Sequence, residues 1–208
     1  SKGYNPVQNS RVSSKLDKWP EQYNSMKNKF IAWREIAAGS SSLPYHATYL
    51  KCADSIVELS NHALNLLDKS HYRDLCFQGS PSVVLCHQDF GRGNAILTDN
   101  GVYVLDLDGV TFDLPARDLR KIIGKTAENK GQWSQGQITD IISWYTKVNP
   151  MTESEKEVLY IDLLYPHWFF GLVKNLYQND KPIKSSEIDR IYKLEQSKLP
   201  VLKSLLKG

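Results

Sequence analysis

The feature that most constrains the fold is a change of hydrophobic periodicity near the middle of the chain. Residues 82–87 (SVVLCH) and 101–107 (GVYVLDL) are short β-branched runs typical of strands, and the Asp-Asn-Gly tip of AILTDNG between them signals a hairpin. On both sides, apolar residues recur at intervals of three and four, which is typical of amphipathic helices. We therefore expect an α+β fold that is mostly helical, with one small antiparallel sheet at its centre.

The flanking segments predict a succession of helices. A capping-box pattern, Thr152-x-x-Glu155, opens a long helix that we expect to lie at the centre of the helical body and to be kinked at Pro166. We expect Pro200 to interrupt the last helix near its end. The predicted helices cover about residues 20–39, 49–67, 116–128, 138–148, 152–173 and 185 onward.

Some residues that could carry chemistry are expected to be structural. Cys86 adjoins an apolar strand and is interpreted as a small buried side chain that packs in the core. We expect Arg117, Arg120 and Lys121 to form a solvated helix face rather than a phosphate site. A set of aromatic residues is expected to belong to the core rather than to a ligand cage. These residues are Trp144, Tyr145, Trp168, Phe169 and Phe170.

The composition argues against nucleic-acid-binding, disulfide-stabilised, zinc-binding and membrane-spanning classes of protein. The 208 residues are enough for one compact unit, and the formal charge of +3 comes from scattered lysines, which argues against nucleic acid as a partner. Three cysteines without CxxC spacing favour neither disulfides nor zinc and suit a reducing, intracellular compartment. No apolar run reaches the length of a membrane span, so we expect none.

One short segment, HQDFGRGN, gathers polar side chains on a glycine-rich loop between the predicted strands. Asp89 and Asn94 lie five residues apart on this loop, and Asp106 and Asp108 end the second strand in VLDLDG. Because a hairpin returns that strand end toward the loop, we expect these carboxylates and the amide to converge. Phosphoryl transfer uses such a set: one carboxylate takes the proton of the attacking hydroxyl, while an Asn and an Asp hold Mg²⁺ on the nucleotide phosphates.

The motifs resemble a known family at this point. The loop is similar to the His-x-Asp-x-x-x-x-Asn loop of the aminoglycoside phosphotransferase and choline kinase branch of the kinase-like fold. A closer resemblance, to the spore coat CotS-like family of endospore-forming bacteria, extends over nearly the whole chain. The stretches that carry it are SKLDKWPEQ, LCHQDFGRGNAIL, VYVLDLDGVTFDLPARDLRKI, WYTKVNP and LLYPHWFFG.

The resemblance implies a role for each matching residue. Asp89 is the candidate catalytic base, with His87 as a support of the catalytic loop. Asn94 and Asp106 are the candidate ligands of Mg²⁺ and ATP, and Asp108 is a further candidate for a second metal. The family's structural aspartate corresponds to Asp118, which we expect to cap the start of its own helix.

The resemblance also implies a protein of two lobes, of which this chain is the carboxyl-terminal, kinase-like lobe. We expect a single unit over 1–208, helical over 13–78 and 115–207, with the catalytic loop and hairpin over 82–108. No glycine-rich nucleotide loop and no strand lysine appear, and the chain does not begin with Met. We therefore expect the amino-terminal lobe to lie outside this chain and the chain alone to be inactive.

Three functions remain open from the sequence. The first is Mg-ATP-dependent phosphorylation of a hydroxyl on an unknown acceptor. The second is a catalytically silent kinase fold that acts as a structural component among spore coat proteins; in either case the resemblance implies synthesis inside the mother cell and then a place in the coat. The third, a hydrolase using His87 and Asp89 with Ser80 or Ser82, lacks a nucleophile-elbow pattern.

Overall fold

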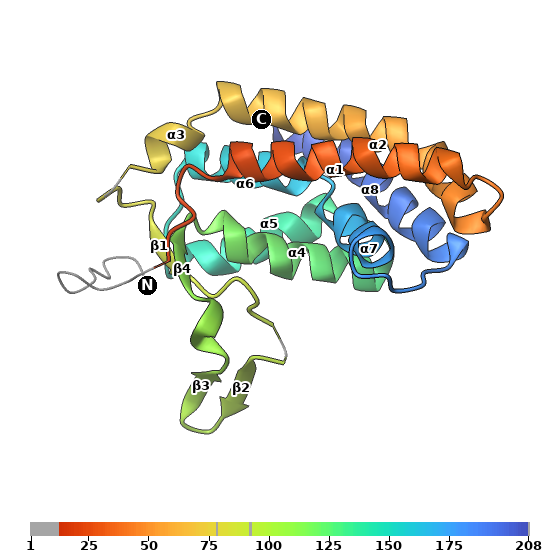
Figure 1. Cartoon of the computed structure of the whole chain (residues 1–208). Helices are drawn as coiled ribbons and strands as arrows, with labels where there is room; N and C mark the ends of the chain where they lie inside the picture. The colour runs from red at the N-terminus through yellow and green to blue at the C-terminus, as the bar shows by residue number, and fades with distance from the viewer. Residues whose placement is uncertain (1–12, 78, 92, 208) are drawn as a thin grey trace.

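The computed structural model of the protein describes residues 13–77, 79–91 and 93–207, and shows a helical body from which one β-hairpin projects (Figure 1). Helices precede and follow the strands, as the periodicity predicts. In chain order the described elements are α1 (Trp19–Gly39), α2 (Pro44–Lys69), α3 (Tyr72–Leu75), β1 (Val84–Cys86), β2 (Ala95–Thr98), β3 (Gly101–Val104), η1 (Leu107–Gly109, a 3₁₀ turn), β4 (Thr111–Asp113), α4 (Ala116–Lys130), α5 (Gln135–Thr146), α6 (Glu153–Leu164), α7 (His167–Tyr177) and α8 (Ser185–Leu205).

The core is formed where the helices pack on one another. Helices α1 and α2 run side by side along one edge of the body (Figure 1), and α6 contacts α2, α4 and α8. The buried side of α6 includes Val158, Leu159 and Ile161, each at most 1% exposed. The expectation that the helix opened by Thr152 is central is confirmed, and its capping box is formed by Thr152 and Glu155.

The long helix predicted from Thr152 is broken rather than kinked. Helix α6 ends at Leu164 and α7 begins at His167, with Tyr165 extended at φ −62° and ψ 138°. The residue before a proline is driven out of the helical region by the proline ring. Pro166 therefore divides the segment into two helices, and the prediction of one kinked helix was wrong.

The prediction for Pro200 was also wrong. Helix α8 continues through Pro200 as far as Leu205. A proline removes one backbone hydrogen bond near the helix end, but Leu202, beyond the proline, is completely buried. The packing of this last turn against the core holds the helical conformation.

The strands form two small sheets instead of one. Strands β2 and β3 form the predicted antiparallel hairpin, with Ala95 opposite Val104 and Thr98 opposite Gly101. Strand β1 does not join them and pairs antiparallel with β4, with Leu85 opposite Phe112. The sequence of a three-residue strand does not identify the strand with which it pairs, so this pairing could be assigned only from the tertiary structure.

Most of the aromatic set is buried or packed against the core, but one member is not. Phe169 is completely buried, whereas Trp144 on α5 is 64% exposed. The prediction for Trp144 was therefore wrong. Cys86 is buried, and its thiol donates to the carbonyl oxygen of Leu114 at 3.3 Å, as expected of a small core side chain. In the part of the chain that the structure describes, no helix is both long enough and apolar enough to cross a membrane.

Candidate active site

The loop that follows β1 is anchored by a carboxylate from α4. The backbone N–H groups of His87 and Gln88 each donate to Asp118 at 2.7 Å. Asp118 therefore caps the candidate catalytic loop. The prediction that it caps the start of its own helix was wrong, because no side-chain cap is formed there. Two charge-assisted hydrogen bonds to successive N–H groups fix the direction in which the loop leaves the sheet.

His87 ties the same loop to the end of β3. Its Nε2 lies 2.8 Å from the carbonyl oxygen of Leu105, and the N–H of Asp89 donates to its Nδ1 at 3.4 Å. Both ring nitrogens are thus engaged by backbone groups, which suits a support of the loop. The hydrolase hypothesis receives no support, because among the described residues no serine hydroxyl is hydrogen-bonded to the ring, and Ser80 and Ser82 are themselves buried.

The backbone brings the three candidate catalytic and metal-binding residues toward one another. The side-chain amide of Asn94 donates to the carbonyl oxygen of Asp89 at 3.0 Å, which turns the amide oxygen away from that carbonyl. The N–H of Leu105 donates to the carbonyl oxygen of Asn94 at 2.9 Å. Asp106, the next residue, therefore leaves β3 directly beside the loop, as the hairpin geometry predicts.

Two residues of this region have backbone conformations that side chains other than glycine seldom adopt. Gln88 has a φ of 70° and Asp106 a φ of 56°. Such strain is held in place by the surrounding hydrogen bonds and is concentrated at functional sites. Asp108, by contrast, lies exposed in the 3₁₀ turn η1, whose Gly109 carbonyl accepts a hydrogen bond from the Gln88 side chain.

The basic residues of α4 do not form the simple solvated face that the sequence suggested. Lys121 Nζ lies 3.5 Å from an oxygen of Asp89 on the candidate catalytic loop. Arg117 donates to the side-chain oxygen of Gln88 at 3.0 Å. Arg120 is buried and lies 2.7 Å from an oxygen of Asp162. Periodicity alone could not reveal this, since the partners come from distant parts of the chain.

A buried polar network joins α1, α4, α6 and α7. Asp162 accepts hydrogen bonds from Tyr23 and Arg120, and His167 Nε2 lies 3.0 Å from the same carboxylate oxygen. The Arg120 guanidinium holds the pKa of Asp162 far below its usual range despite the burial of that carboxylate. Burial first, and the neighbouring Arg120 second, lower the pKa of His167 to about 3. The network therefore contains a paired charge and a neutral imidazole at neutral pH.

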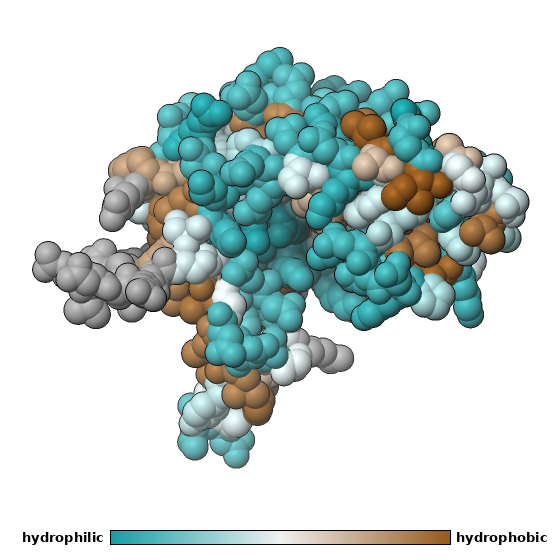
Figure 2. Space-filling model, viewed as in Figure 1, coloured by the Kyte–Doolittle hydropathy of each residue, from teal (hydrophilic) through white to brown (hydrophobic). Residues whose placement is uncertain are grey.

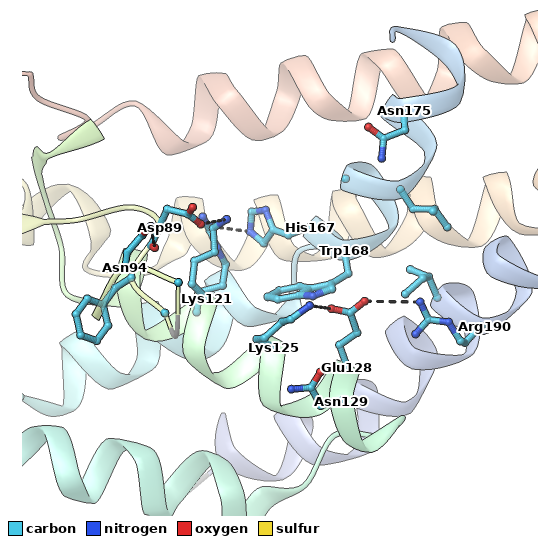
Figure 3. Close-up of a pocket in the computed structure, with 17 residues that line it drawn as sticks. Asp89, Asn94, Lys121, Lys125, Glu128, Asn129, His167, Trp168, Asn175 and Arg190 are labelled. Carbon is cyan, nitrogen blue, oxygen red and sulfur yellow. Dashed lines mark hydrogen bonds and ion pairs between the residues drawn. The ribbon is translucent and has the colours of Figure 1, made fainter. Parts of the chain in front are cut away.

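A pocket of about 910 Å³ opens beside the loop, between α4, α7 and α8 (Figure 3). Asp89 and Asn94 lie at one end of it, and Lys125, Glu128 and Arg190 at the other. The surface is hollowed above the hairpin, and the residues around this hollow are mostly hydrophilic (Figure 2). The sequence predicted the loop residues but not this pocket, because α7 and α8 contribute to it from far along the chain.

The chemistry of the donor set suits a magnesium ion held on nucleotide phosphates. Asn94 offers an amide oxygen and Asp106 a carboxylate, and both are hard ligands. Among the residues that the structure describes, no group of three or more His, Cys, Asp and Glu could hold a metal ion by itself. Magnesium in phosphotransferases is bound by one or two side chains and completed by phosphates and water. Asn94 and Asp106 are of the residue types that would supply such a pair.

Comparison with known proteins now gives the family. The model of the family described as "Spore coat putative kinase YutH" matches residues 9–203. The chain belongs to this spore coat family. The resemblance to spore coat proteins that the sequence motifs indicated is thereby confirmed.

One relative agrees with this assignment to the YutH family, and one solved structure is similar in fold. Spore coat protein S of Bacillus subtilis (strain 168) is 30% identical over 203 residues, which are 95% of this chain and 58% of that protein. The crystal structure of an aminoglycoside phosphotransferase from Alicyclobacillus acidocaldarius subsp. acidocaldarius DSM 446 superposes with a TM-score of 0.68 at 15% identity, covering 92% of this chain and 60% of that one. The YutH-family chain thus spans about three fifths of the length of the proteins it matches.

The structural match confirms the expected fold class. The YutH-family chain is mostly helical with small antiparallel strand pairs, and it aligns with the kinase-like fold of the aminoglycoside phosphotransferase. At 15% identity, this match describes the fold alone.

Proposed function

We propose that this chain carries the catalytic loop of a Mg-ATP-dependent phosphotransferase that phosphorylates a hydroxyl group. The observation that carries the proposal is the backbone link at Leu105. The N–H of Leu105 donates to the carbonyl oxygen of Asn94, and its own carbonyl oxygen is hydrogen-bonded to the ring of His87. Asp106, with its strained backbone, is the next residue. One hydrogen-bonded unit thereby includes the base loop and both candidate metal ligands.

Each side chain has one task in this proposal. Asp89 accepts the proton of the attacking hydroxyl, and His87 and Asp118 hold the loop so that the carboxylate faces the pocket. Asn94 and Asp106 would hold the metal. When bound, Mg²⁺ on the ATP phosphates would neutralise negative charge and orient the transferred group. Asp108 remains a candidate for a second metal ion.

The rest of the nucleotide site is proposed to come from a further lobe. Both faces of the β2–β3 hairpin expose apolar side chains, since Leu97, opposite Val102, is 82% exposed and Tyr103, opposite Ile96 on the other face, is 55% exposed. Figure 2 shows hydrophobic surface, coloured brown, on the projecting hairpin. Exposed apolar surface of this kind marks an interaction site. We propose that an amino-terminal lobe of the full-length protein packs there, and that this chain without it has little activity.

Membership of a spore coat family supports a proposal about location. We propose that the protein is made inside the mother cell and then becomes part of the spore coat, where coat proteins are its partners. A hydroxyl-bearing coat protein and a small molecule are both compatible with the proposed chemistry.

Nucleotide binding by the full-length protein tests the metal site. Calorimetry should show ATP binding that requires Mg²⁺ and is lost when Asp106 is replaced by Ala. The matched control is Asp99→Ala, which removes the same charge from the hairpin turn and should bind as the unmodified protein does. Equal binding by both variants would refute the role of Asp106, and no ATP binding by the unmodified protein would favour the silent structural alternative.

Turnover tests the base. Asp89→Asn should lower phosphoryl transfer by roughly 100- to 10,000-fold while ATP binding persists, since the change removes a proton acceptor and keeps the shape of the side chain. Full activity of this variant would show that the base is another group.

A further inference from the structure

The pocket extends from the catalytic loop along one face of α4. Lys121, Lys125 and Glu128 recur on that face at helical spacing, and all three line the pocket. Lys121 lies beside Asp89, so the first of these positions marks the reacting end. Seven residues of helix from Lys121 to Glu128 correspond to about 10 Å. The pocket therefore has room for a molecule that reaches about that far from the Asp89 carboxylate.

The end of the pocket away from Asp89 carries an excess of positive charge. Glu128 is flanked by Lys125 at 3.0 Å and by Arg190, from α8, at 3.6 Å. Two cations thus share one carboxylate, and their side chains remain 68% and 54% exposed, respectively. Figure 3 shows the three side chains converging beside Trp168. Exposed ion pairs of this kind are weak, so Lys125 and Arg190 are free to turn toward a ligand.

The other charges lining the pocket are already balanced. Arg120 is paired with the buried Asp162, and Lys121 with Asp89. Among the described lining residues the uncompensated charge is therefore the positive one at the Lys125 and Arg190 end. A ligand that carries several ammonium groups, such as an aminoglycoside, would meet no matching set of carboxylates there.

An aromatic ring, that of Trp168, lies between these ends, and two amides line the part of the pocket away from Asp89 (Figure 3). Trp168 packs on Gly124, where a β-carbon would overlap the indole ring, and the ring is held in place on α4. Asn129 and Asn175 line the same pocket. Indole rings and side-chain amides are groups that bind the faces and the hydroxyl groups of sugar rings.

We propose that the acceptor is an anionic carbohydrate, with a hydroxyl at Asp89, its ring against Trp168 and its negative group on Lys125 and Arg190. This proposal rests on the function proposed above, because it takes Asp89 as the reacting end. It assigns to Lys125 and Arg190 the role of selecting the charge of the acceptor.

Three sugars that differ in charge test this assignment on the full-length protein. Glucuronate carries a carboxylate, glucose is neutral and glucosamine carries an ammonium group, and their binding is compared by ligand-observed NMR without nucleotide. Glucuronate should bind at least 10-fold more tightly than the other two. In the double variant Lys125→Gln, Arg190→Gln, this preference should disappear. The control variant Lys51→Gln, Lys69→Gln removes two exposed charges from α2 and should keep it.

The outcomes separate this proposal from the proposed reaction. Tighter binding of glucose or glucosamine, no binding of glucuronate, or an unchanged preference in the double variant would overturn the anionic acceptor. ATP binding is measured in parallel on the same samples. Glucuronate preference without Mg²⁺-dependent ATP binding would leave the anion site standing and refute the phosphotransferase, and the reverse result would refute the anion site alone.

Discussion

At the scale of single residues, the candidate site depends on side chains that hold the backbone in unusual positions. Asp118 is an example, since its two oxygens accept the N–H groups of His87 and Gln88. Gln88 has a φ of 70°, a conformation that must be maintained by its neighbours. The carboxylate of Asp118 is one of the groups that maintain it.

Replacing Asp118 by Asn should therefore weaken both the loop and the fold. The amide offers only one acceptor oxygen, so one loop N–H loses its partner. We expect the free energy of unfolding to fall by about 1–3 kcal/mol, measured by urea denaturation. Asp140→Asn, an exposed aspartate on α5, is the control and should change little. Equal stability of the two variants would show that Asp118 does not hold the loop.

Gly124 is a second residue whose role depends on a single contact. A β-carbon at this position would overlap the ring of Trp168, and α4 and α7 meet here. Gly124→Ala should lower stability by about 1–3 kcal/mol because of overpacking, although alanine ordinarily stabilises a helix relative to glycine. Thermal denaturation measures the stability of this variant and of a control, Gly171→Ala in α7. Gly171 has open space around it, so the control should be neutral or stabilising. A stabilising Gly124→Ala would contradict the contact.

At the scale of the elements, the break at Pro166 creates a helix start inside the protein. The first backbone N–H groups of α7 have no partner within the helix and need hydrogen-bond acceptors. The N–H groups of Trp168 and Phe169 donate to Glu195 of α8 at 3.0 and 2.9 Å. Lys198, completely buried, contacts the same carboxylate and donates to the carbonyl oxygen of Tyr165 at 2.9 Å. One ion pair from α8 thus joins the end of the extended Tyr165 segment to the start of α7.

Removing one partner of this pair should cost more than removing both. Glu195→Ala leaves the Lys198 ammonium buried without a counter-ion, and we expect the free energy of unfolding to fall by about 3–5 kcal/mol. Adding Lys198→Met removes the uncompensated charge and should restore part of the loss. Urea denaturation of the two single variants and the double variant measures this coupling. Additive effects would show that the two side chains act independently.

At the scale of the whole molecule, the buried network couples stability to pH. Tyr23, Arg120, Asp162 and His167 come from α1, α4, α6 and α7, so their contacts exist only in the folded protein. Burial and Arg120 lower the pKa of His167 to about 3, whereas an unfolded histidine titrates near pH 6.5. Between these pH values His167 is protonated in the unfolded chain but not in the folded protein. The free energy of unfolding therefore decreases as the pH is lowered through this range.

The comparison of His167→Gln with the unmodified protein isolates this effect. From about pH 6 to pH 4.5, the unmodified protein should lose about 1.4 kcal/mol per pH unit relative to the variant. Asp113, whose pKa burial raises to about 6, acts in the opposite direction, but it does so in both proteins and cancels. His62→Gln, at an exposed site, should show no such slope. A constant difference between the proteins across this range would refute the assignment.

How much could be predicted from the sequence differed among the elements. The helices, the β2–β3 hairpin and the capping box of α6 were predictable, because each depends on residues close together in the chain. The break at Pro166 and the continuation of α8 through Pro200 were not. At Pro166 the local effect of the proline ended the helix. At Pro200 the burial of Leu202 against the core outweighed that local effect.

By itself, the sequence determined which residue types stand on the loop from His87 to Asn94 and that a hairpin returns Asp106 toward it, since local spacing and turn chemistry decide both. Only the tertiary structure decided the pairing of β1 with β4, the partners of Arg120, and the joining of Lys125 with Arg190 in one pocket. Those contacts join residues far apart in the chain. Their positions follow from the packing of buried helices, which no local pattern records.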